Sequence, residues 1–244
     1  MFLTRFRLNT ARPGARRLLS SPQAMHAAVM SSFPTLLPTD TPPTTGPRVL
    51  WRVDHTTRAE VMLYIVGPDR PDLTHLVEQA GWPAAAAADP DRPGWQTRPY
   101  APFLARLEAD SVWAFRLTAN PVHSIRRTEG EPTKRTAHLT PRHQMDWLLK
   151  RQKDSGFRIL EKPLDQRRLP DGDQYQLIVR DRRDLSFGKT EHTTGRKNRV
   201  TLTTATFDGR LQVTDPDALR RTLTSGLGKA KAYGCGLMTL APAR

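Results

Sequence analysis

The sequence predicts an α+β protein in which one order of elements, β-α-β-β-α-β, occurs twice. Its 244 residues are enough for two domains of roughly 100–150 residues each. Segments with strand-like alternation and segments with helical periodicity follow one another in this order, and the pattern restarts near residues 108–110. The order is the split βαβ arrangement of ferredoxin-like (RRM-like) domains. We therefore predict two tandem ferredoxin-like domains, residues 1–108 and 109–244, with an inserted basic β-hairpin in the second.

The first half begins with a strand and a capped helix. Phe2–Asn9 alternates between apolar and polar side chains, which is typical of a strand with one buried face. Thr10–Ser20 is predicted to be a loop. Ser21 and Pro22 then suit the N-cap and the first turn of a helix, and an apolar stripe starts at Met25. The other elements predicted for this half are the strands Arg48–Asp54 and Glu60–Val66, the helix Pro71–Ala80 and a strand within Trp95–Pro102.

The second half repeats the order of the first. Asp208 and Gly209 are typical of a hairpin turn, which we place between the strands Val200–Phe207 and Leu211–Val213. The segment 123–138 is predicted to be a basic loop. The other predicted elements are the strand Ser111–Asn120, a helix from Thr140 to Asp154, the strands Phe157–Glu161 and Gln174–Arg180, a helix from Asp215 to Thr224 and the final strand Cys235–Ala241.

The charge balance favours a polyanionic partner. There are 38 Lys and Arg residues against 24 Asp and Glu residues, a formal net charge of +14, which favours nucleic acid over an acidic membrane surface. No apolar run approaches the ~18 residues of a membrane span, so we predict no membrane partner. The one cysteine, Cys235, excludes an internal disulfide and a cysteine-rich zinc site, and it indicates a reducing cytoplasm.

Several basic or glycine-rich segments are candidates for contact with phosphate groups. The loop Gly226–Met238 holds four glycines, which let backbone N–H groups approach an anion, and two lysines, which add charge. It lacks the patterns of nucleotide-binding loops, so we expect the phosphate of a polymer. The alternative for each basic tract is a solvated surface. The predicted RNA-binding residues are Arg16, Arg17, Arg126, Arg127, Arg182, Arg183, Lys189, Arg196, Lys197, Arg199, Gly226, Gly228, Lys229, Lys231, Gly234 and Gly236.

His26 is the first candidate for acid–base chemistry. Its ordinary pKa of about 6.5 allows proton transfer near neutral pH, and a helix N-terminus stabilises phosphate. Self-cleavage of RNA needs a base for the 2′-hydroxyl, an acid for the leaving 5′-oxygen and cations around the phosphorane. A histidine, the nearby pair Arg16 and Arg17, and a glycine-lysine loop meet those needs without a metal or cofactor. The alternative is a solvated or capping histidine.

The other candidates for chemistry are weaker. His138 and His143 share no helix face, so we predict no metal site there. Cys235, between two glycines, is predicted to be a small buried residue rather than a nucleophile.

Several longer segments of the chain are distinctive together: Met1-Phe-Leu-Thr-Arg-Phe-Arg-Leu-Asn9, the pair at 16–17, Ser21-Pro-Gln-Ala-Met-His26, Phe115-Arg-Leu-Thr-Ala-Asn-Pro121, Gly156-Phe-Arg-Ile-Leu160, Phe207-Asp-Gly-Arg-Leu-Gln-Val-Thr-Asp-Pro216 and, above all, Gly226-Leu-Gly-Lys-Ala-Lys-Ala-Tyr-Gly-Cys-Gly-Leu-Met-Thr-Leu-Ala-Pro242. With these segments the chain resembles the CasE family, the CRISPR repeat endoribonucleases of type I-E systems. It implies two ferredoxin-like domains that bind the stem-loop of CRISPR repeat RNA. It also implies metal-independent cleavage at the 3′ base of the hairpin, giving 2′,3′-cyclic phosphate and 5′-hydroxyl ends, by an enzyme that stays bound as a subunit of Cascade.

The resemblance assigns the catalytic role to His26, with one departure from the family pattern. Some members carry a tyrosine three residues before the histidine, as a second catalytic group. Here that position is Gln23, which cannot transfer a proton and can only orient the RNA by hydrogen bonds. The second catalytic role is therefore open. There are two alternatives to the endoribonuclease hypothesis. The protein could be a non-catalytic subunit that binds the crRNA hairpin, or a general RNA or DNA chaperone.

Overall fold

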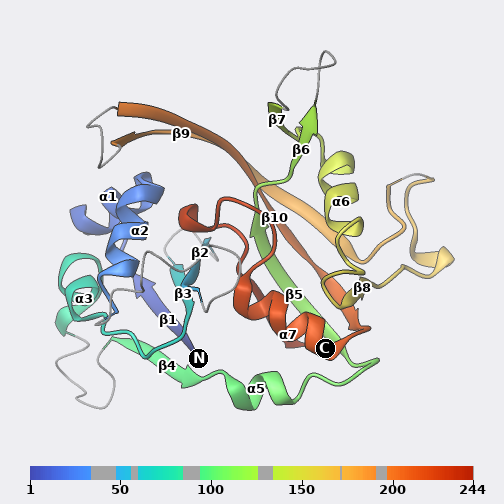
Figure 1. Cartoon of the computed structure of the whole chain (residues 1–244), viewed down its shortest axis with the longest axis horizontal. Coiled ribbons are helices and arrows are strands. Elements are labelled where there is room, and N and C mark those ends of the chain that lie inside the picture. Colours follow the sequence, from blue (N-terminus) through green and yellow to red (C-terminus); the bar gives the residue numbers. More distant parts are fainter. Residues whose placement is uncertain are drawn as a thin grey trace. The chain divides into compact units, whose positions relative to one another are not determined.

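The protein folds into two compact units, each built around an antiparallel sheet (Figure 1). The computed structural model describes residues 1–33, 48–55, 60–84, 94–125, 134–170, 172–190 and 197–243, without the side chains of residues 134, 189, 190, 197 and 198. Unit 1 comprises residues Met1–Arg106, Thr224–Gly226 and Lys231–Leu237; unit 2 comprises Leu107–Leu223, Leu227–Ala230 and Met238–Arg244. The loop before the last strand thus contributes residues to both units.

Unit 1 has the strand order of a ferredoxin-like domain. Its elements are β1 (Phe2–Leu8), α1 (Pro13–Ser20), α2 (Pro22–Met30), β2 (Leu50–His55), β3 (Val61–Gly67), α3 (Thr74–Ala80), β4 (Trp95–Pro99), α5 (Ala101–Ala105) and, from the end of the chain, the short 3₁₀ helix η2 (Lys231–Tyr233). The sheet has the order β2-β3-β1-β4, with all neighbours antiparallel. The two inner strands are the first and third in sequence, as β-α-β-β-α-β connectivity requires.

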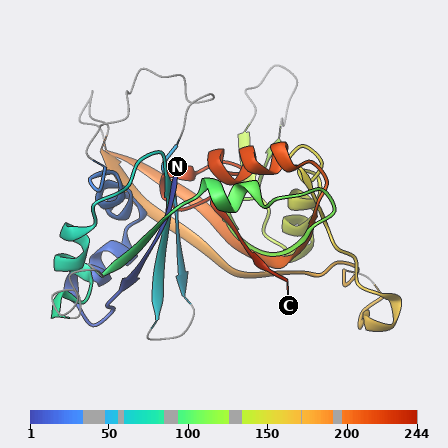
Figure 2. The same ribbon diagram turned by 90° about the horizontal axis from the view of Figure 1, so that it is seen from below.

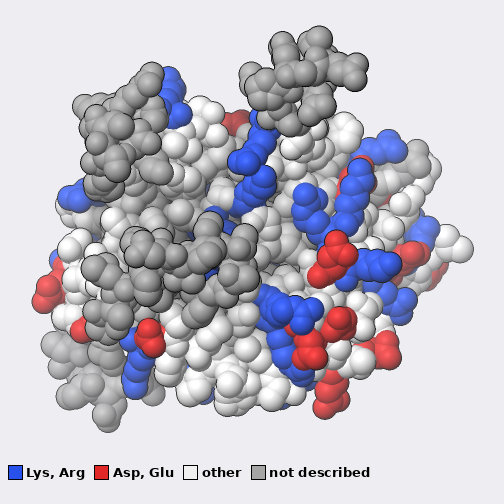
Figure 3. Space-filling model, in the orientation of Figure 1, with Lys and Arg blue, Asp and Glu red and all other residues white. Residues whose placement is uncertain are grey.

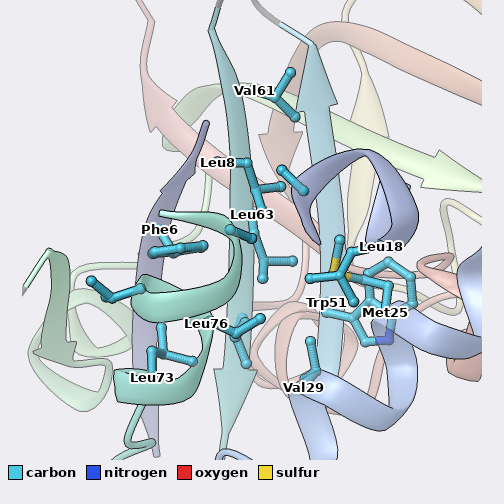
Figure 4. Packing of buried hydrophobic residues seen from close by; sticks show 14 of the residues in the cluster. Phe6, Leu8, Leu18, Met25, Val29, Trp51, Val61, Leu63, Leu73 and Leu76 are labelled. Atoms are coloured by element: carbon cyan, nitrogen blue, oxygen red, sulfur yellow. The ribbon is translucent and has the colours of Figure 1, made fainter. Parts of the chain in front are cut away.

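The alternation in β1 separates a buried face from an exposed one. Phe6 and Leu8 are buried, whereas Arg5 and Arg7 between them are exposed. The buried side chains meet the apolar faces of α1, α2 and α3 in one core (Figure 4). Met25 of α2 lies in that core and is 1% exposed. The predicted strand and the predicted apolar stripe of α2 are both confirmed.

The prediction of a loop at Thr10–Ser20 is wrong, because Pro13–Ser20 forms α1. Proline in the first turn favours a helix start, and Ala15 and Leu18 are buried against the core. At Gly14 a Cβ atom would lie 2.2 Å from the backbone oxygen of Gln79, so glycine allows α1 to approach α3 closely. Two buried positions among arginines make too weak an apolar stripe to predict this helix.

Unit 2 repeats the ferredoxin-like strand order and adds two hairpins. Its elements are β5 (Val112–Ala119), β6 (Val122–Ile125), β7 (Lys134–Ala137), α6 (Pro141–Leu149), β8 (Phe157–Ile159), the 3₁₀ helix η1 (Leu164–Gln166), β9 (Leu177–Thr190), β10 (Lys197–Val213), α7 (Pro216–Ser225) and β11 (Met238–Pro242). The sheet has the order β11-β5-β10-β8, and β9 pairs with β10. Figure 2 shows α6 and α7 on the same face of this sheet. The predicted fold class is confirmed for both halves.

The hairpin turn predicted at Asp208 and Gly209 is wrong, because both residues lie inside the continuous strand β10. The carboxylate of Asp208 accepts hydrogen bonds from Nε of Arg116 and Nε of Arg180, each at 2.6 Å. At Gly209 a Cβ atom would lie 2.4 Å from the backbone oxygen of Gln176. Partners on neighbouring strands therefore decide the conformation of this Asp-Gly pair, against its local turn preference.

Other boundaries also differ from the prediction: the predicted helix Pro71–Ala80 begins at Thr74, and the predicted strand Gln174–Arg180 is β9, from Leu177 to Thr190. The segment 123–138 is not simply a loop, since β6 and β7 pair antiparallel from Val122–Ala137 to Ile125–Lys134. The helix predicted to reach Asp154 ends as α6 at Leu149 and continues as turns. Among the described residues, no helix is long and apolar enough to cross a membrane.

Candidate functional site

His26 lies on α2, whose start is fixed as the sequence predicts. The Ser21 hydroxyl accepts a hydrogen bond from the backbone N–H of Ala24 at 3.2 Å, and Pro22 occupies the first turn. Met25 and Val29 bury one side of the helix in the core of unit 1. The core therefore holds α2 so that the neighbouring His26 side chain is only partly buried.

The imidazole of His26 is in an environment that favours its neutral form. Its Nδ1 atom is buried and has no hydrogen-bond partner among the residues described. Burial lowers the pKa of His26 from its ordinary value, because the charged form loses hydration. At neutral pH the ring is therefore uncharged and able to accept a proton.

Gln23 lies three residues before His26 on the same helix and is partly buried. Residues at this spacing are neighbours on one helix surface. The Gln23 amide can donate and accept hydrogen bonds but cannot exchange a proton at neutral pH. Its position therefore suits the orientation of a ligand held near His26.

The segment Lys231–Leu237, from the far end of the chain, packs against α2 and β2 within unit 1. A buried arginine holds it there: Arg52 Nη1 donates a hydrogen bond of 2.9 Å to the backbone oxygen of Leu237. The same guanidinium donates to both carboxylate oxygens of Asp54, at 2.7 and 2.9 Å. Since Arg52 is 1% exposed, this contact is a buried tie between β2 and the C-terminal segment.

The glycines of the C-terminal loop fit tightly against β2. All four predicted glycines have positive φ angles. At Gly234 a Cβ atom would lie 2.7 Å from the Trp51 ring, and at Gly226 one would lie 2.8 Å from Leu50 Cδ2. Backbone conformation and close packing thus account for glycine at these two positions, and the predicted phosphate contacts remain predictions.

Lys231 provides a cation on the segment that packs against α2. Its side chain is partly buried, and its pKa is lowered by burial and then by the positive charge of Arg48. No ion pair with a carboxylate is present for Lys231 within the described ranges. A charged group held in this way is suited to an anionic ligand.

Arg16 and Arg17 are exposed on α1, which packs against α2. The Arg16 guanidinium donates to the backbone oxygens of Thr10 and Ala11, at 3.3 and 2.6 Å. These bonds turn one side of the guanidinium toward the chain. Both arginines therefore belong to a helix of their own and not, as predicted, to a loop before α2.

Five of the predicted basic residues lie on the paired strands β9 and β10: Arg182, Arg183, Lys189, Lys197 and Arg199. Arg182 donates to the backbone oxygen of Leu139 at 3.1 Å and to Asp184 at 3.2 Å, so part of its charge is balanced by an acid. Arg199 donates from Nε to Ser186 Oγ at 2.7 Å. Arg183 is exposed on β9. The backbones of Lys189 and Lys197 belong to the far end of the paired strands β9 and β10. Arg126, Arg127 and Arg196 lie outside the described residues.

Gly228 and Lys229 lie in the part Leu227–Ala230 of the C-terminal loop, which belongs to unit 2. Lys229 forms an isolated β-bridge with Asn120 at the end of β5, and its side chain is exposed. Cys235 is fully buried, as predicted, and burial raises the pKa of its thiol to about 12. No group of three His, Cys, Asp or Glu side chains that could hold a metal ion occurs in the part of the chain that the structure describes.

Sequence reasoning missed two features of these units. One is the Arg52–Asp54 pair, because a charged i, i+2 pair in a strand is usually exposed. The other is a row of three histidines, His123, His138 and His143, whose adjacent ring centroids are 4.4 and 5.9 Å apart. His123 lies 15 residues from His138 in the sequence, and only the pairing of β6 with β7 brings them together.

Comparison with known proteins gives one consistent family. Residues 1–242 match the model of a family described as CRISPR associated protein. The CRISPR-associated endoribonuclease Cse3 of Thermus thermophilus is 30% identical over 243 residues, which cover 99% of this chain and 100% of that protein. A structure of CRISPR endoribonuclease Cse3 bound to a 19-nucleotide RNA matches with a TM-score of 0.74 and 26% identity, over 99% of this chain and 100% of that one.

A second structure, of Thermus thermophilus Cse3 bound to an RNA representing a pre-cleavage complex, has a TM-score of 0.71 and 27% identity. That match covers 99% of this chain and 98% of the other. Sequence and fold therefore agree over nearly the whole length. The protein belongs to the family of CRISPR-associated proteins that includes Cse3.

Proposed function

We propose that the protein is an endoribonuclease that binds the stem-loop of CRISPR repeat RNA and cleaves it at the 3′ base of the hairpin. The observation that carries this proposal is His26, a partly buried histidine on a helix against which the C-terminal segment with Lys231 packs. The names of the relatives, an endoribonuclease and its RNA complexes, support the same activity. The net charge of +14 supports a polyanionic substrate.

In the proposed mechanism His26 removes the proton of the 2′-hydroxyl. The 2′-oxygen then forms a bond to the adjacent phosphorus, and the bond from phosphorus to the 5′-oxygen breaks, which leaves a 2′,3′-cyclic phosphate. Lys231 stabilises the negative charge of the phosphorane, and Gln23 orients the 2′-hydroxyl. The leaving 5′-oxygen takes its proton from solvent and becomes a 5′-hydroxyl, a slower route than one with a positioned acid.

The proposed setting is the cytoplasm, with the cleaved crRNA retained by the enzyme as a subunit of Cascade. Slow turnover is compatible with this setting, because an enzyme that keeps its product needs to cut only once. The second candidate function is a non-catalytic subunit that binds the crRNA hairpin. It is favoured by Gln23, which cannot serve as the second proton-transfer group.

Cleavage without a metal is the first test. We expect the protein to cut its repeat RNA in the presence of EDTA, and a deoxy substitution at the 2′ position next to the scissile phosphate to abolish the reaction. Denaturing electrophoresis with end-group analysis measures both outcomes. A requirement for Mg²⁺, or cleavage of the deoxy substrate, would exclude the mechanism, whereas binding without cleavage would favour the second function.

The pH dependence of cleavage tests the state of His26. Burial lowers its pKa, so the neutral, proton-accepting form persists to lower pH than for a free histidine. We expect kcat/KM to be constant at pH 7–8 and to fall only as the pH drops below about 6.5, the ordinary pKa of histidine. Single-turnover rates at subsaturating protein give this profile. An acid limb with its midpoint above 7 would contradict an uncharged histidine in the free protein.

A further inference from the structure

Unit 2 contains a pocket of about 170 Å³ that the proposed cleavage mechanism does not use. Asn120 at the end of β5 and His123 of β6 line one part of it. Arg135 of β7, Trp147 of α6, Arg151 in the turn after α6 and Lys229 line other parts. Four separate stretches of the chain thus bring polar and basic side chains to one place.

The cations of this pocket have no acidic partner within the described residues. Its lining includes Arg135, Arg151 and Lys229 but no Asp or Glu, and none of the three forms an ion pair there. The guanidinium of Arg151 lies over the Trp147 ring, 4.3 Å from its centroid, and donates to the Trp147 backbone oxygen at 2.8 Å. A cation held in a fixed, partly buried position without a carboxylate is suited to an anion from outside.

Two uncharged polar atoms in the pocket also have no partner. Four buried side-chain atoms in the described part of the chain make no hydrogen bond, and two of them, Asn120 Oδ1 and His123 Nδ1, belong to residues that line this pocket. The Asn120 amide can turn to present its NH₂ group, and the His123 ring can carry a proton on Nδ1. Both side chains can therefore donate hydrogen bonds to an anion.

A row of histidines extends from the pocket. The His123 ring stacks on His138 at 4.4 Å, and His143 follows at 5.9 Å. The pKa of His138 is lowered by burial and then by His123, His143, Lys150 and Arg151, all of which carry or can carry positive charge. Figure 3 shows Lys and Arg side chains on the surface where β7 and α6 lie.

We propose that this pocket binds one backbone phosphate of the RNA, through Arg151, Lys229, Asn120 and His123. The inference rests on the proposed function and adds to it a second contact point in unit 2, whereas His26 belongs to unit 1. A diester phosphate of RNA and free inorganic phosphate share the same recognition chemistry, so the test separates them.

The variant Arg151→Met tests the contact to RNA. Methionine keeps an unbranched side chain beside Trp147 but removes the charge. The RNA is the repeat hairpin with a 2′-deoxy substitution at the cut site, so that binding is measured without cleavage. For the full-length protein we expect about tenfold weaker binding, and a plot of log affinity against log salt whose slope is smaller in magnitude by about 0.7–1.

Arg158→Met is the matched control. Arg158 is exposed on β8, donates to Gln212 Oε1 at 2.7 Å and does not line the pocket. For Arg158→Met we expect the slope of log affinity against log salt to equal that of the wild type. Equal slopes for Arg151→Met and the wild type, in a variant whose thermal unfolding is unchanged, would overturn the proposal. His123→Gln, which keeps a hydrogen-bonding group, provides a second variant if Arg151→Met does not fold.

Titration with inorganic phosphate gives an independent measurement. We expect the imidazole NMR signals of His123 to shift with phosphate, not with chloride at equal ionic strength, and not in Arg151→Met. A phosphate response with an unchanged RNA slope would overturn the assignment to RNA in favour of free phosphate. A failure of the proposed function would be observed separately, because the wild type would then leave unmodified repeat RNA uncut, whatever the outcome of this titration.

Discussion

Replacing His26 with alanine is expected to lower the rate of repeat cleavage by about 10²–10⁴-fold, the usual contribution of a general base. The affinity for the hairpin should stay within about twofold, because the variant removes a neutral ring and no charge. Single-turnover cleavage and a binding titration with the same hairpin measure the two effects. The expected pattern is loss of chemistry with retention of binding.

His55→Ala is the matched control for His26→Ala. His55 is also a histidine of unit 1, but it is exposed at the end of β2, and we expect its cleavage rate to equal that of the wild type. If His26→Ala cuts at the wild-type rate, another group is the base. If the wild type binds the hairpin tightly but does not cut it, the protein is the non-catalytic subunit of the second hypothesis.

Elements that depend on local periodicity could be predicted from the sequence. The alternation of β1 and the capped, apolar stripe of α2 are local patterns, and they place Phe6 and Met25 in the core as expected. Elements that depend on distant partners could not. The local sequence at Asp208 favours a turn, but Asp208 lies within β10, and its carboxylate binds Arg116, which is 92 residues away.

The same distinction applies to the candidate site. His26 could be selected from its type, its place near a capped helix start and the family resemblance. The segment beside it could not, because the bond from Arg52 to Leu237 joins residues 185 positions apart. Sequence reasoning assigned the glycines of that segment to phosphate contact, whereas Gly234 also has to fit against the Trp51 ring.

The buried pair Arg52–Asp54 is the basis of the largest expected effect on stability. Replacing Asp54 with alanine leaves the guanidinium of Arg52 buried without its carboxylate, since the two side chains are only 1% and 7% exposed. Breaking a buried pair in this way costs about 3–5 kcal/mol of unfolding free energy. Chemical denaturation followed by circular dichroism measures the loss. The more exposed pair Arg167–Glu161 is the control, because its members are 26% and 67% exposed, and Glu161→Ala should cost about 1 kcal/mol or less.

The double variant Arg52→Met with Asp54→Ala separates the unpaired charge from lost packing. An apolar side chain in place of a buried ion pair is often neutral, so we expect the double variant to regain most of the stability lost in Asp54→Ala. It should nevertheless cleave more slowly than the wild type, because methionine cannot donate a hydrogen bond to the Leu237 oxygen that holds Lys231–Leu237 against β2. A stable double variant that cleaves more slowly than the wild type would assign Arg52 to the positioning of the C-terminal segment beside α2. A stable double variant that cleaves at the wild-type rate would show that Arg52 has no such positioning role.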